Sequence, residues 1–359
     1  MGARITFKNC TSDLESIKDI DKTILTDYEL RILAFIQKWK GGEQDFELRT
    51  SGSTGEPKKI SFDRSHLELS AKRTINHFDL NHDDTSLVCI DVRYIGGLMM
   101  LVRSLVAGMD MIVCEPSSNP YQEVDMSKPT FIAIVPLQLK QLIDYASRDG
   151  VVDQIKAVIV GGASIDSALE ELTHELSIPV YQTFGMTETA SHFAVRRISG
   201  PQFDEWYTVI NGWEVDSDVD GRLAVNWGLP HTEWIVTNDM VEFSDGKGFR
   251  WVGRLDNVIN SGGIKIHSEA LEQTIKSELL RLGIDSRFFV FGVPDTDLGE
   301  KLVLLMEGQP NWEKTIHQHL KDSLPKFHCP RELFFLDDFI ETPNGKIDRP
   351  KNIELVLSQ

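Results

Sequence analysis

Cysteine, long apolar runs and basic clusters are all scarce in this sequence. The 4 cysteines stand far apart with no C-x-x-C pair, which argues against a zinc site and against a disulfide framework. A reducing cytoplasm therefore fits the cysteine pattern best. No uninterrupted apolar stretch approaches the roughly eighteen residues that a membrane-spanning helix needs, so no membrane association is expected.

Positive charge is also in short supply. Lys and Arg number 37 against 55 Asp and Glu, which gives a formal net charge of -18 at pH 7, and no run is rich in Lys or Arg. A surface of this average sign repels the phosphates of a nucleic acid, so nucleic acid is excluded as a partner. A small anionic ligand must instead find a pocket that is locally positive.

Several common catalytic motifs are missing as well. The sequence has no G-x-S-x-G nucleophile elbow and no H-E-x-x-H metal motif, so hydrolases of those kinds are excluded. Neither the Walker A loop nor the dinucleotide fingerprint G-x-G-x-x-G occurs. Any nucleotide must therefore be bound by a loop of another kind.

The hydrophobic pattern predicts an α/β protein of two domains. Between residues 85 and 185, short β-rich runs alternate with helical stretches, which is typical of a mainly parallel sheet. Close-set strands rich in Trp and Val, separated by Asn-Gly and Asp-Gly turns, predict a small antiparallel β unit at about 206–252. A compact α+β region follows. The expected domains are a large N-terminal domain, 1–255, and a small C-terminal domain, 256–359.

A glycine- and hydroxyl-rich segment follows the predicted strand FELR and precedes a helix. Its glycines let successive backbone N–H groups converge, its hydroxyls add donors, and its lysines neutralise charge. This composition favours a phosphate-binding loop over a polar surface turn. The residues expected to bind phosphate are Thr50, Ser51, Gly52, Ser53, Thr54, Gly55 and Lys58.

From this loop onward, a series of motifs resembles the adenylate-forming superfamily, which includes acyl- and aryl-CoA synthetases, luciferase and the adenylation domains of peptide synthetases. The residues that resemble its adenine-binding wall are Gly161, Gly162, Ala163, Thr183 and Phe184. Thr187 and Glu188 complete a G-x-T-E motif. The resemblance implies that Thr187 contacts the α-phosphate and that Glu188 helps to hold Mg²⁺, a cation that prefers oxygen ligands.

The motifs nearer the carboxyl end resemble the mobile parts of that superfamily. Asp239, in T-N-D, resembles the aspartate that accepts both ribose hydroxyls, and G-R-L-D places Arg254 as a ribose contact and Asp256 as the hinge. The residues that resemble the loop for thioester formation are Gly262, Gly263 and Lys265. Lys346, in P-N-G-K-I, resembles the catalytic lysine.

The resemblance implies an ATP-dependent acid-CoA ligase in the cytoplasm. A carboxylate is a poor acyl donor, so it first attacks the α-phosphate of ATP to form an acyl-AMP, and pyrophosphate leaves. Charge gathers at phosphorus, where Lys346 and Mg²⁺ stabilise it. The thiol of coenzyme A then displaces AMP. A mobile C-terminal domain could supply Lys346 to the first step and the loop 261–266 to the second.

Two features narrow the carboxylate substrate. Arg103 lies on an apolar helical stretch, and the G-x-T-E motif continues into Ser191 and His192. Both features resemble the corresponding segments of the o-succinylbenzoate-CoA ligases of menaquinone biosynthesis. The substrate of those enzymes carries two carboxylates. Arg103 could hold the carboxylate that does not react. Equally, Arg103 could extend its side chain to solvent or pair with an acid such as Asp110.

Four departures from the superfamily pattern bear on the site. Tyr94, expected near the acyl pocket, stands where a histidine is usual, Phe184 replaces a tyrosine and Asn238 a glycine. The phosphate loop also begins early, so an N-terminal subdomain is expected to be reduced. Another aryl or acyl acid-CoA ligase and a non-catalytic adenylate-binding protein therefore stay open as alternatives, and the oligomeric state, including a homodimer, stays open too.

Overall fold

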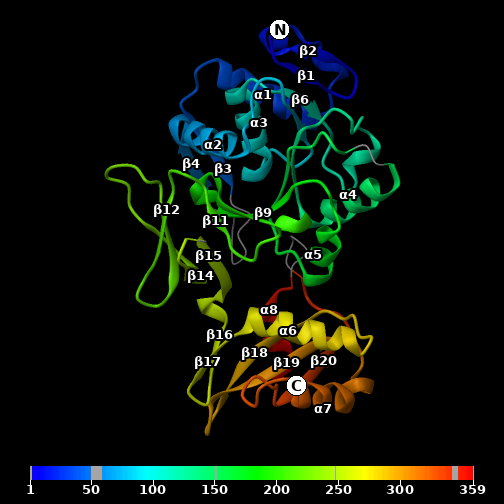
Figure 1. Cartoon of the computed structure of the whole chain (residues 1–359), viewed down its shortest axis with the longest axis vertical. Helices are drawn as coiled ribbons and strands as arrows, with labels where there is room; N and C mark the ends of the chain where they lie inside the picture. The colour runs from blue at the N-terminus through cyan, green and yellow to red at the C-terminus, as the bar shows by residue number, and fades with distance from the viewer. Residues whose placement is uncertain (1, 50–58, 150–151, 247, 342–346, 359) are drawn as a thin grey trace. The chain divides into compact units, whose positions relative to one another are not determined.

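The computed structural model describes residues 2–49, 59–149, 152–246, 248–341 and 347–358 (Figure 1). The chain divides into two compact units. The first comprises residues 1–214, 227–232 and 244–249, and the second comprises 215–226, 233–243 and 250–359.

A nine-stranded sheet forms the centre of the first unit. In spatial order its strands are β11 (Thr208–Val209), β10 (Ser191–Arg197), β9 (Val180–Met186), β8 (Ala157–Val160), β7 (Phe131–Ile134), β5 (Thr85–Val88), β6 (Asp110–Val113), β1 (Arg4–Thr6) and β2 (Thr11–Asp13). Neighbours between β9 and β1 are parallel, whereas β2, β10 and β11 join antiparallel. The predicted parallel α/β sheet is confirmed.

Helices cover both faces of this sheet. The side chains of β7 alternate between two buried clusters, with Phe131 in one and Ile132 in the other. The first cluster includes residues of α1 (Asp27–Lys40) and α3 (Ile95–Ala107), and the second includes residues of α4 (Pro136–Asp149) and α5 (Ser167–His174). Helix α2 (Arg64–Phe78) packs against α3.

Two details differ from the predicted pattern. A strand, β4 (Lys59–Asp63), pairs with β3 (Asp45–Arg49) and separates the phosphate loop from α2. The predicted antiparallel unit at about 206–252 also begins differently, because Val209 of β11 pairs with Ala194 in the large sheet. The chain then turns at Gly212, whose φ of +90° favours glycine, before β12 begins.

A four-stranded sheet follows, in which β13 and β14 pair antiparallel, and its residues are divided between the two units. Its strands, in order, are β12 (Glu214–Ser217), β13 (Arg222–Asn226), β14 (Ile235–Ser244) and β15 (Gly248–Arg254). Short 3-10 turns complete the connections: Leu14–Asp19, Lys22–Ile24, Pro120–Gln122, Thr187–Thr189, Gly200–Gln202, Leu255–Asn257 and Pro310–Trp312.

The rest of the second unit is an α+β fold, as expected. Its sheet contains β17 (Ile264–His267), β16 (Val258–Ser261), β19 (Gly299–Glu307) and β18 (Phe288–Asp295), with β20 (Glu332–Leu336) paired to β19. Apolar residues of α6 (Ser268–Arg281) and α7 (Glu313–Ser323) pack in one cluster, and α8 (Arg349–Leu357) contributes to another on the opposite face of β18 and β19.

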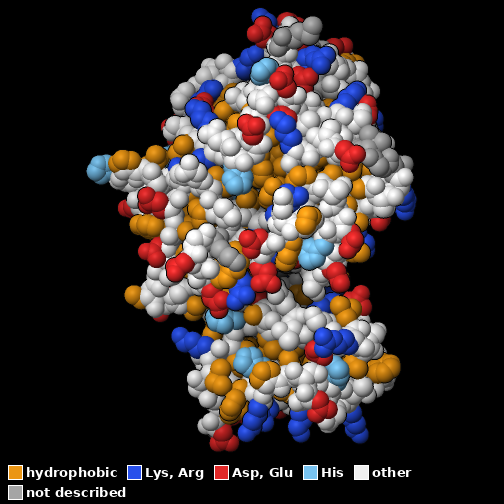
Figure 2. All heavy atoms as spheres, in the orientation of Figure 1, with side chains coloured by type: hydrophobic (Ala, Val, Ile, Leu, Met, Phe, Trp, Pro, Cys, Tyr) orange, Lys and Arg blue, Asp and Glu red, His pale blue; other side chains and the backbone are white. Residues whose placement is uncertain are grey.

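Acidic and basic side chains are interspersed on the viewed face of the molecule (Figure 2). Within the described ranges, no helix combines the length and the apolar character that crossing a membrane requires.

Candidate active site

The predicted adenine-binding residues meet where the neighbouring parallel strands β8 and β9 approach their carboxyl ends. Gly161 follows β8 directly, and Thr183 lies on β9. A Cβ on Gly161 would lie 2.5 Å from Thr183 Oγ1, a hydroxyl that donates to the Val160 carbonyl at 3.1 Å. Only glycine fits this close approach. Open α/β sheets bind ligands along this edge.

The other predicted adenine-binding residues lie at the same edge. Gly162, before Ala163, has φ +84° and so occupies the left-handed region. Phe184 packs edge-on against Tyr207 and Phe249, with ring centroids 5.3 Å apart in each case. The aromatic ring that replaces the usual tyrosine is thus fixed by other aromatic rings.

Glu188 is exposed on the 3-10 turn Thr187–Thr189. Its carboxylate makes no hydrogen bond or ion pair with another described residue, so it is available to a cation. The described ranges contain no group of three or more potential metal-ligating side chains. Mg²⁺ commonly takes one or two carboxylates, with phosphates and water as its remaining ligands, and a single Glu188 fits that pattern.

The backbone after this turn is strained. Ala190 and Ser191 have φ +47° and +92°, values that residues with a side chain adopt rarely. Ser70 Oγ donates to the Ala190 carbonyl at 2.8 Å, and Thr189 Oγ1 donates to the Ser191 carbonyl at 2.6 Å. These bonds hold the chain in a conformation that places Ser191 beside Arg103, and strain of this kind often marks functional sites.

Arg103, on α3, is 1% exposed. Its NH2 group donates to Ser191 Oγ at 3.0 Å and lies 3.4 Å from His192 Nδ1. Its Nε has no partner in the described structure, and NH1 has only the Met100 sulfur at 4.0 Å. Burial lowers the pKa of Arg103 to about 9, which still leaves a cation at neutral pH. No described carboxylate pairs with this cation.

Both alternatives for Arg103 are therefore wrong in this structure. The side chain does not extend to solvent, because almost none of it is exposed. Asp110 pairs instead with Arg4, whose NH2 lies 3.0 Å from Asp110 Oδ2. A buried cation without an anion is costly, so this position is expected to meet a negative charge from elsewhere.

The predicted ribose contacts lie in the second unit. Asp239, on β14, accepts a hydrogen bond from Trp251 Nε1 at 3.1 Å. Burial raises the pKa of the Asp239 carboxyl above its ordinary value, and the bond from Trp251 partly offsets this shift. Asp239 is therefore a desolvated acceptor with one oxygen already engaged.

The predicted hinge residue is held by two side chains of the same unit. Asn238 Nδ2 donates to Asp256 Oδ2 at 2.9 Å, and Arg254 NH2 lies 3.5 Å from the same oxygen. The asparagine that replaces the superfamily's usual glycine thus contacts the residue expected to be the hinge. Whether Asp256 is a hinge stays a prediction.

The predicted thioester loop is the tip of the hairpin between β16 and β17. Gly262 and Gly263 have φ +58° and +80°, the left-handed pair that a two-residue type I′ turn requires. Gly262 N–H donates to the Leu298 carbonyl at 2.9 Å, and Lys265 is exposed two positions after Gly263.

The structure does not place every predicted site residue beside the residues described above. Tyr94 caps α3 and is 45% exposed, with no described contact to Arg103 or Ser191. The residues that lie outside the described ranges are Thr50, Ser51, Gly52, Ser53, Thr54, Gly55, Lys58 and Lys346.

Sequence reasoning missed the polar residues of α2. Thr74 Oγ1 lies 3.2 Å from His192 Nε2, and Ser70 holds the strained carbonyl of Ala190. Their signal was a pair of hydroxyls four residues apart on a helix that also carries the apolar residues Leu67, Ala71 and Ile75. Only the tertiary packing of α2 against β10 shows what they contact.

Two family models match this chain. The model described as AMP-binding enzyme matches residues 48–247, more than half of the chain, and the AMP-binding enzyme C-terminal domain matches residues 286–346. The chain belongs to the AMP-binding enzyme family. The resemblance to adenylate-forming enzymes is thereby confirmed.

Curated relatives of this AMP-binding enzyme include proteins named 2-succinylbenzoate–CoA ligase. One from Bacillus cytotoxicus is 26% identical over 334 residues, covering 84% of this chain and 68% of the relative. One from Bacillus cereus is 24% identical over 357 residues, covering 90% and 73%.

Solved structures are similar to most of this chain. An acyl-CoA synthetase (AMP-forming)/AMP-acid ligase II-like protein from Dyadobacter fermentans is 35% identical with a TM-score of 0.65, covering 96% of this chain and 99% of that one. The o-succinylbenzoate CoA synthetase of Bacillus subtilis, in complex with its acyl-adenylate intermediate, is 21% identical with a TM-score of 0.71 and covers 85% and 68%. The predicted fold class is confirmed.

Proposed function

We propose that this AMP-binding enzyme is an AMP-forming acid-CoA ligase and that its acid is o-succinylbenzoate, as in menaquinone biosynthesis. The observation that carries the choice of acid is Arg103, a buried guanidinium without a carboxylate partner among the described residues. An aromatic acid with a second carboxylate supplies the missing charge. The names of the curated relatives support the same substrate.

The free energy of burial favours this interpretation. A buried cation is tolerated when an anion and hydrogen bonds compensate its lost hydration. Ser191 and His192 are both uncharged partners of Arg103, so they satisfy hydrogen bonds without neutralising it. A substrate carboxylate at this position gains a charge-assisted hydrogen bond in a region shielded from water.

The nucleotide is proposed to bind along the carboxyl edge of β8 and β9. Gly161, Gly162 and Ala163 would lie against adenine with Phe184, and Thr187 would donate to the α-phosphate. The loop at 50–58 would hold the remaining phosphates, and Asp239 and Arg254 the ribose. The close packing of Gly161 on Thr183 supports a flat backbone surface there.

The proposed reaction proceeds in two steps. In the first, a carboxylate oxygen of the acid bonds to the α-phosphorus of ATP, and the bond to the bridging oxygen of pyrophosphate breaks. Lys346 would donate to the oxygens that gain charge, and Glu188 would hold Mg²⁺, which neutralises the phosphates. In the second step, the coenzyme A thiolate attacks the acyl carbon, AMP leaves, and the thiol proton passes to solvent.

We also propose that the C-terminal domain turns about Asp256 between the steps. Two half-reactions at one acyl group need different neighbouring residues, and a hinged domain supplies them in turn. Lys346 would serve the first step. The turn with Gly262 and Gly263 would serve the second, and its exposed Lys265 suits an anionic co-substrate such as coenzyme A.

The test measures pyrophosphate release when the protein is mixed with ATP, Mg²⁺ and a panel of acids. We expect o-succinylbenzoate to give the highest kcat/KM, and its analogue without the ring carboxylate to fall at least tenfold below it. Arg103→Met, which keeps the packing volume, should abolish this preference. Release with another acid would indicate a different ligase, and silence with every acid would favour a non-catalytic adenylate-binding protein.

A further inference from the structure

Thr74 is a fully buried residue of α2 with no part in the proposed chemistry. Its hydroxyl lies 3.2 Å from His192 Nε2 and 3.2 Å from the Ser70 carbonyl. The other nitrogen of the same imidazole, Nδ1, lies 3.4 Å from Arg103 NH2. Thr74 is thus linked through one histidine to the guanidinium that is proposed to bind substrate.

One arrangement of protons gives each of these contacts a donor and an acceptor. A guanidinium can only donate, so the contact between Arg103 NH2 and His192 Nδ1 is a hydrogen bond only when Nδ1 carries no proton. Ser191 Oγ, which lies 3.4 Å from the same Nδ1, can then donate its hydroxyl proton to it. The imidazole proton is then on Nε2, which donates to Thr74 Oγ1. Thr74 in turn donates its hydroxyl proton to the Ser70 carbonyl, an acceptor that every helical residue offers.

The imidazole in this chain is neutral. Burial lowers the pKa of His192 well below its ordinary value, and the positive charge of Arg103 lowers it further. His77, on α2, acts in the same direction, and burial lowers the pKa of His77 as well. A neutral histidine with a free lone pair on Nδ1 can support Arg103 without cancelling its charge.

The hydroxyl of Thr74 favours the His192 tautomer with its proton on Nε2. Without its hydroxyl, the Nε2 proton would be buried with no acceptor, at a cost comparable to a lost hydrogen bond. Moving the proton to Nδ1 would remove that cost, but it would place an N–H opposite the NH2 group of Arg103. The guanidinium would then lose an acceptor and change its position.

We propose that Thr74 is a specificity-determining positioning residue, which fixes the Nε2–H tautomer of His192 so that Arg103 presents its unused donors to the non-reacting carboxylate of the acid. The inference rests on the proposed function and deepens it, since it predicts discrimination between diacids and monoacids. NH2 is engaged by Ser191 and His192, whereas Nε and NH1 have no oxygen partner among the described residues.

The test compares Thr74→Val, which removes the hydroxyl and keeps the shape, with Thr74→Ser, which keeps the hydroxyl. Thr173→Val is the matched control, because Thr173 is also fully buried and donates to the carbonyl four residues earlier, at 2.6 Å. We expect Thr74→Val to raise the KM for o-succinylbenzoate about tenfold. The KM values for ATP and for the analogue without the ring carboxylate should stay unchanged.

Thr74→Ser and Thr173→Val should both match the unmodified protein in every KM. The proposal is overturned if Thr74→Val weakens both acids equally or if Thr74→Ser weakens the diacid as much as Thr74→Val. Failure of the proposed function looks different: the unmodified protein would not distinguish the diacid from its analogue, and Arg103→Met would change nothing.

A second measurement needs no change at Thr74. Nitrogen-15 NMR of the unmodified protein, with the His192 signals assigned by loss in His192→Gln, distinguishes a protonated from an unprotonated ring nitrogen. We expect a proton on Nε2 and a bare Nδ1 at neutral pH. A proton on Nδ1, or on both nitrogens, would overturn the proposal even if Thr74→Val failed to fold.

Discussion

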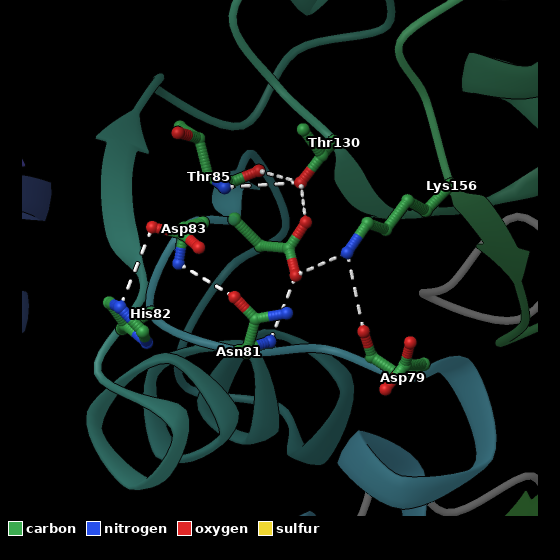
Figure 3. Close-up of polar contacts among 8 residues, drawn as sticks. Asp79, Asn81, His82, Asp83, Thr85, Thr130 and Lys156 are labelled. Atoms are coloured by element: carbon green, nitrogen blue, oxygen red, sulfur yellow. Dashed lines mark hydrogen bonds and ion pairs between the residues drawn. The ribbon is translucent and has the colours of Figure 1, made fainter.

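Asp84 is a buried carboxylate immediately before β5, at the opposite end of the parallel strands from the candidate site. Figure 3 shows Asn81, Thr130 and Lys156, the residues that donate to it. Its oxygens accept from Thr130 Oγ1 at 2.8 Å, Lys156 Nζ at 2.9 Å and the Asn81 N–H at 2.9 Å. We expect Asp84→Ala to lower the free energy of unfolding by about 2 kcal/mol, because these donors lose their shared acceptor. Urea denaturation measures the change.

Asp83 provides the control for this prediction. Its side chain is 85% exposed and lies next to Asp84 in sequence. Asp83→Ala should change the free energy of unfolding by less than about 0.5 kcal/mol. Equal changes at both positions would show that the buried hydrogen bonds of Asp84 do not add to the free energy of unfolding.

The buried carboxylate of Asp239 should lower the free energy of unfolding at neutral pH while it contributes to ATP binding. Burial raises its pKa in the folded state, so the folded protein binds that proton more tightly than the unfolded chain does. The free energy of unfolding therefore falls as pH rises through the window above the ordinary pKa. Asp239→Asn should remove this loss, raising stability at pH 7 but not at the acid end of the window.

The same substitution tests the ribose contact. We expect Asp239→Asn to raise the KM for ATP about tenfold, because an amide accepts only one of two ribose hydroxyls as well as a carboxylate does. Unfolding titrations at several pH values, together with kinetics at pH 7, measure both effects. If Asp239→Asn changed the free energy of unfolding by the same amount at every pH, the raised pKa of Asp239 would be contradicted. An unchanged KM for ATP would contradict the ribose contact.

At the scale of elements, the start of α3 depends on one of two adjacent glycines. A Cβ on Gly97 would lie 2.5 Å from the Asp91 carbonyl, whereas a Cβ on Gly96 would meet nothing within 4 Å. Gly97→Ala should therefore destabilise the protein by about 2 kcal/mol through overpacking. Gly96→Ala should stabilise it by up to about 1 kcal/mol, since alanine favours a helix.

Thermal or urea unfolding of the two variants provides the comparison. Both substitutions add one methyl group at consecutive helical positions, so helix propensity alone predicts equal effects. Effects of the same sign would mean that the close approach of α3 to the backbone at Asp91 does not constrain the helix.

Elements with a strong period were predictable from the sequence, and short strands were not. Helix α6 (Ser268–Arg281) is an example, because its apolar residues repeat every three or four positions. Strand β4 was missed because its five residues carry three polar side chains, and only its pairing with β3 defines it. Strand β11 joined the large sheet through tertiary pairing that no local pattern encodes.

In the candidate site, too, some residues were predictable from the sequence and others were not. Arg103, Ser191 and His192 could be singled out from their sequence neighbours, and the structure brings them into contact. Thr74 could not, because α2 and β10 meet only in the folded chain. Tyr94 was expected near the acyl pocket from its position in a motif, yet it caps α3 with a largely exposed side chain.

At the scale of the whole molecule, the two proposed steps should be separable by substitution. Lys346→Ala should slow pyrophosphate release about a hundredfold, because charge at phosphorus loses its ammonium donor. Thioester formation from supplied acyl-AMP should then be nearly unchanged. Lys265→Ala is the comparison, with the opposite pattern expected. Rapid-quench assays of each half-reaction measure both, and equal losses in both steps would contradict the division of labour.

The most direct test of acyl-adenylate formation follows an oxygen atom. When the carboxylates of o-succinylbenzoate carry oxygen-18, attack on the α-phosphorus followed by displacement with coenzyme A leaves one heavy oxygen in AMP. Mass spectrometry of the products should therefore find AMP with a single heavy oxygen and the coenzyme A thioester in equal amounts. Heavy oxygen in pyrophosphate, or unlabelled AMP formed alongside the thioester, would contradict the proposed mechanism.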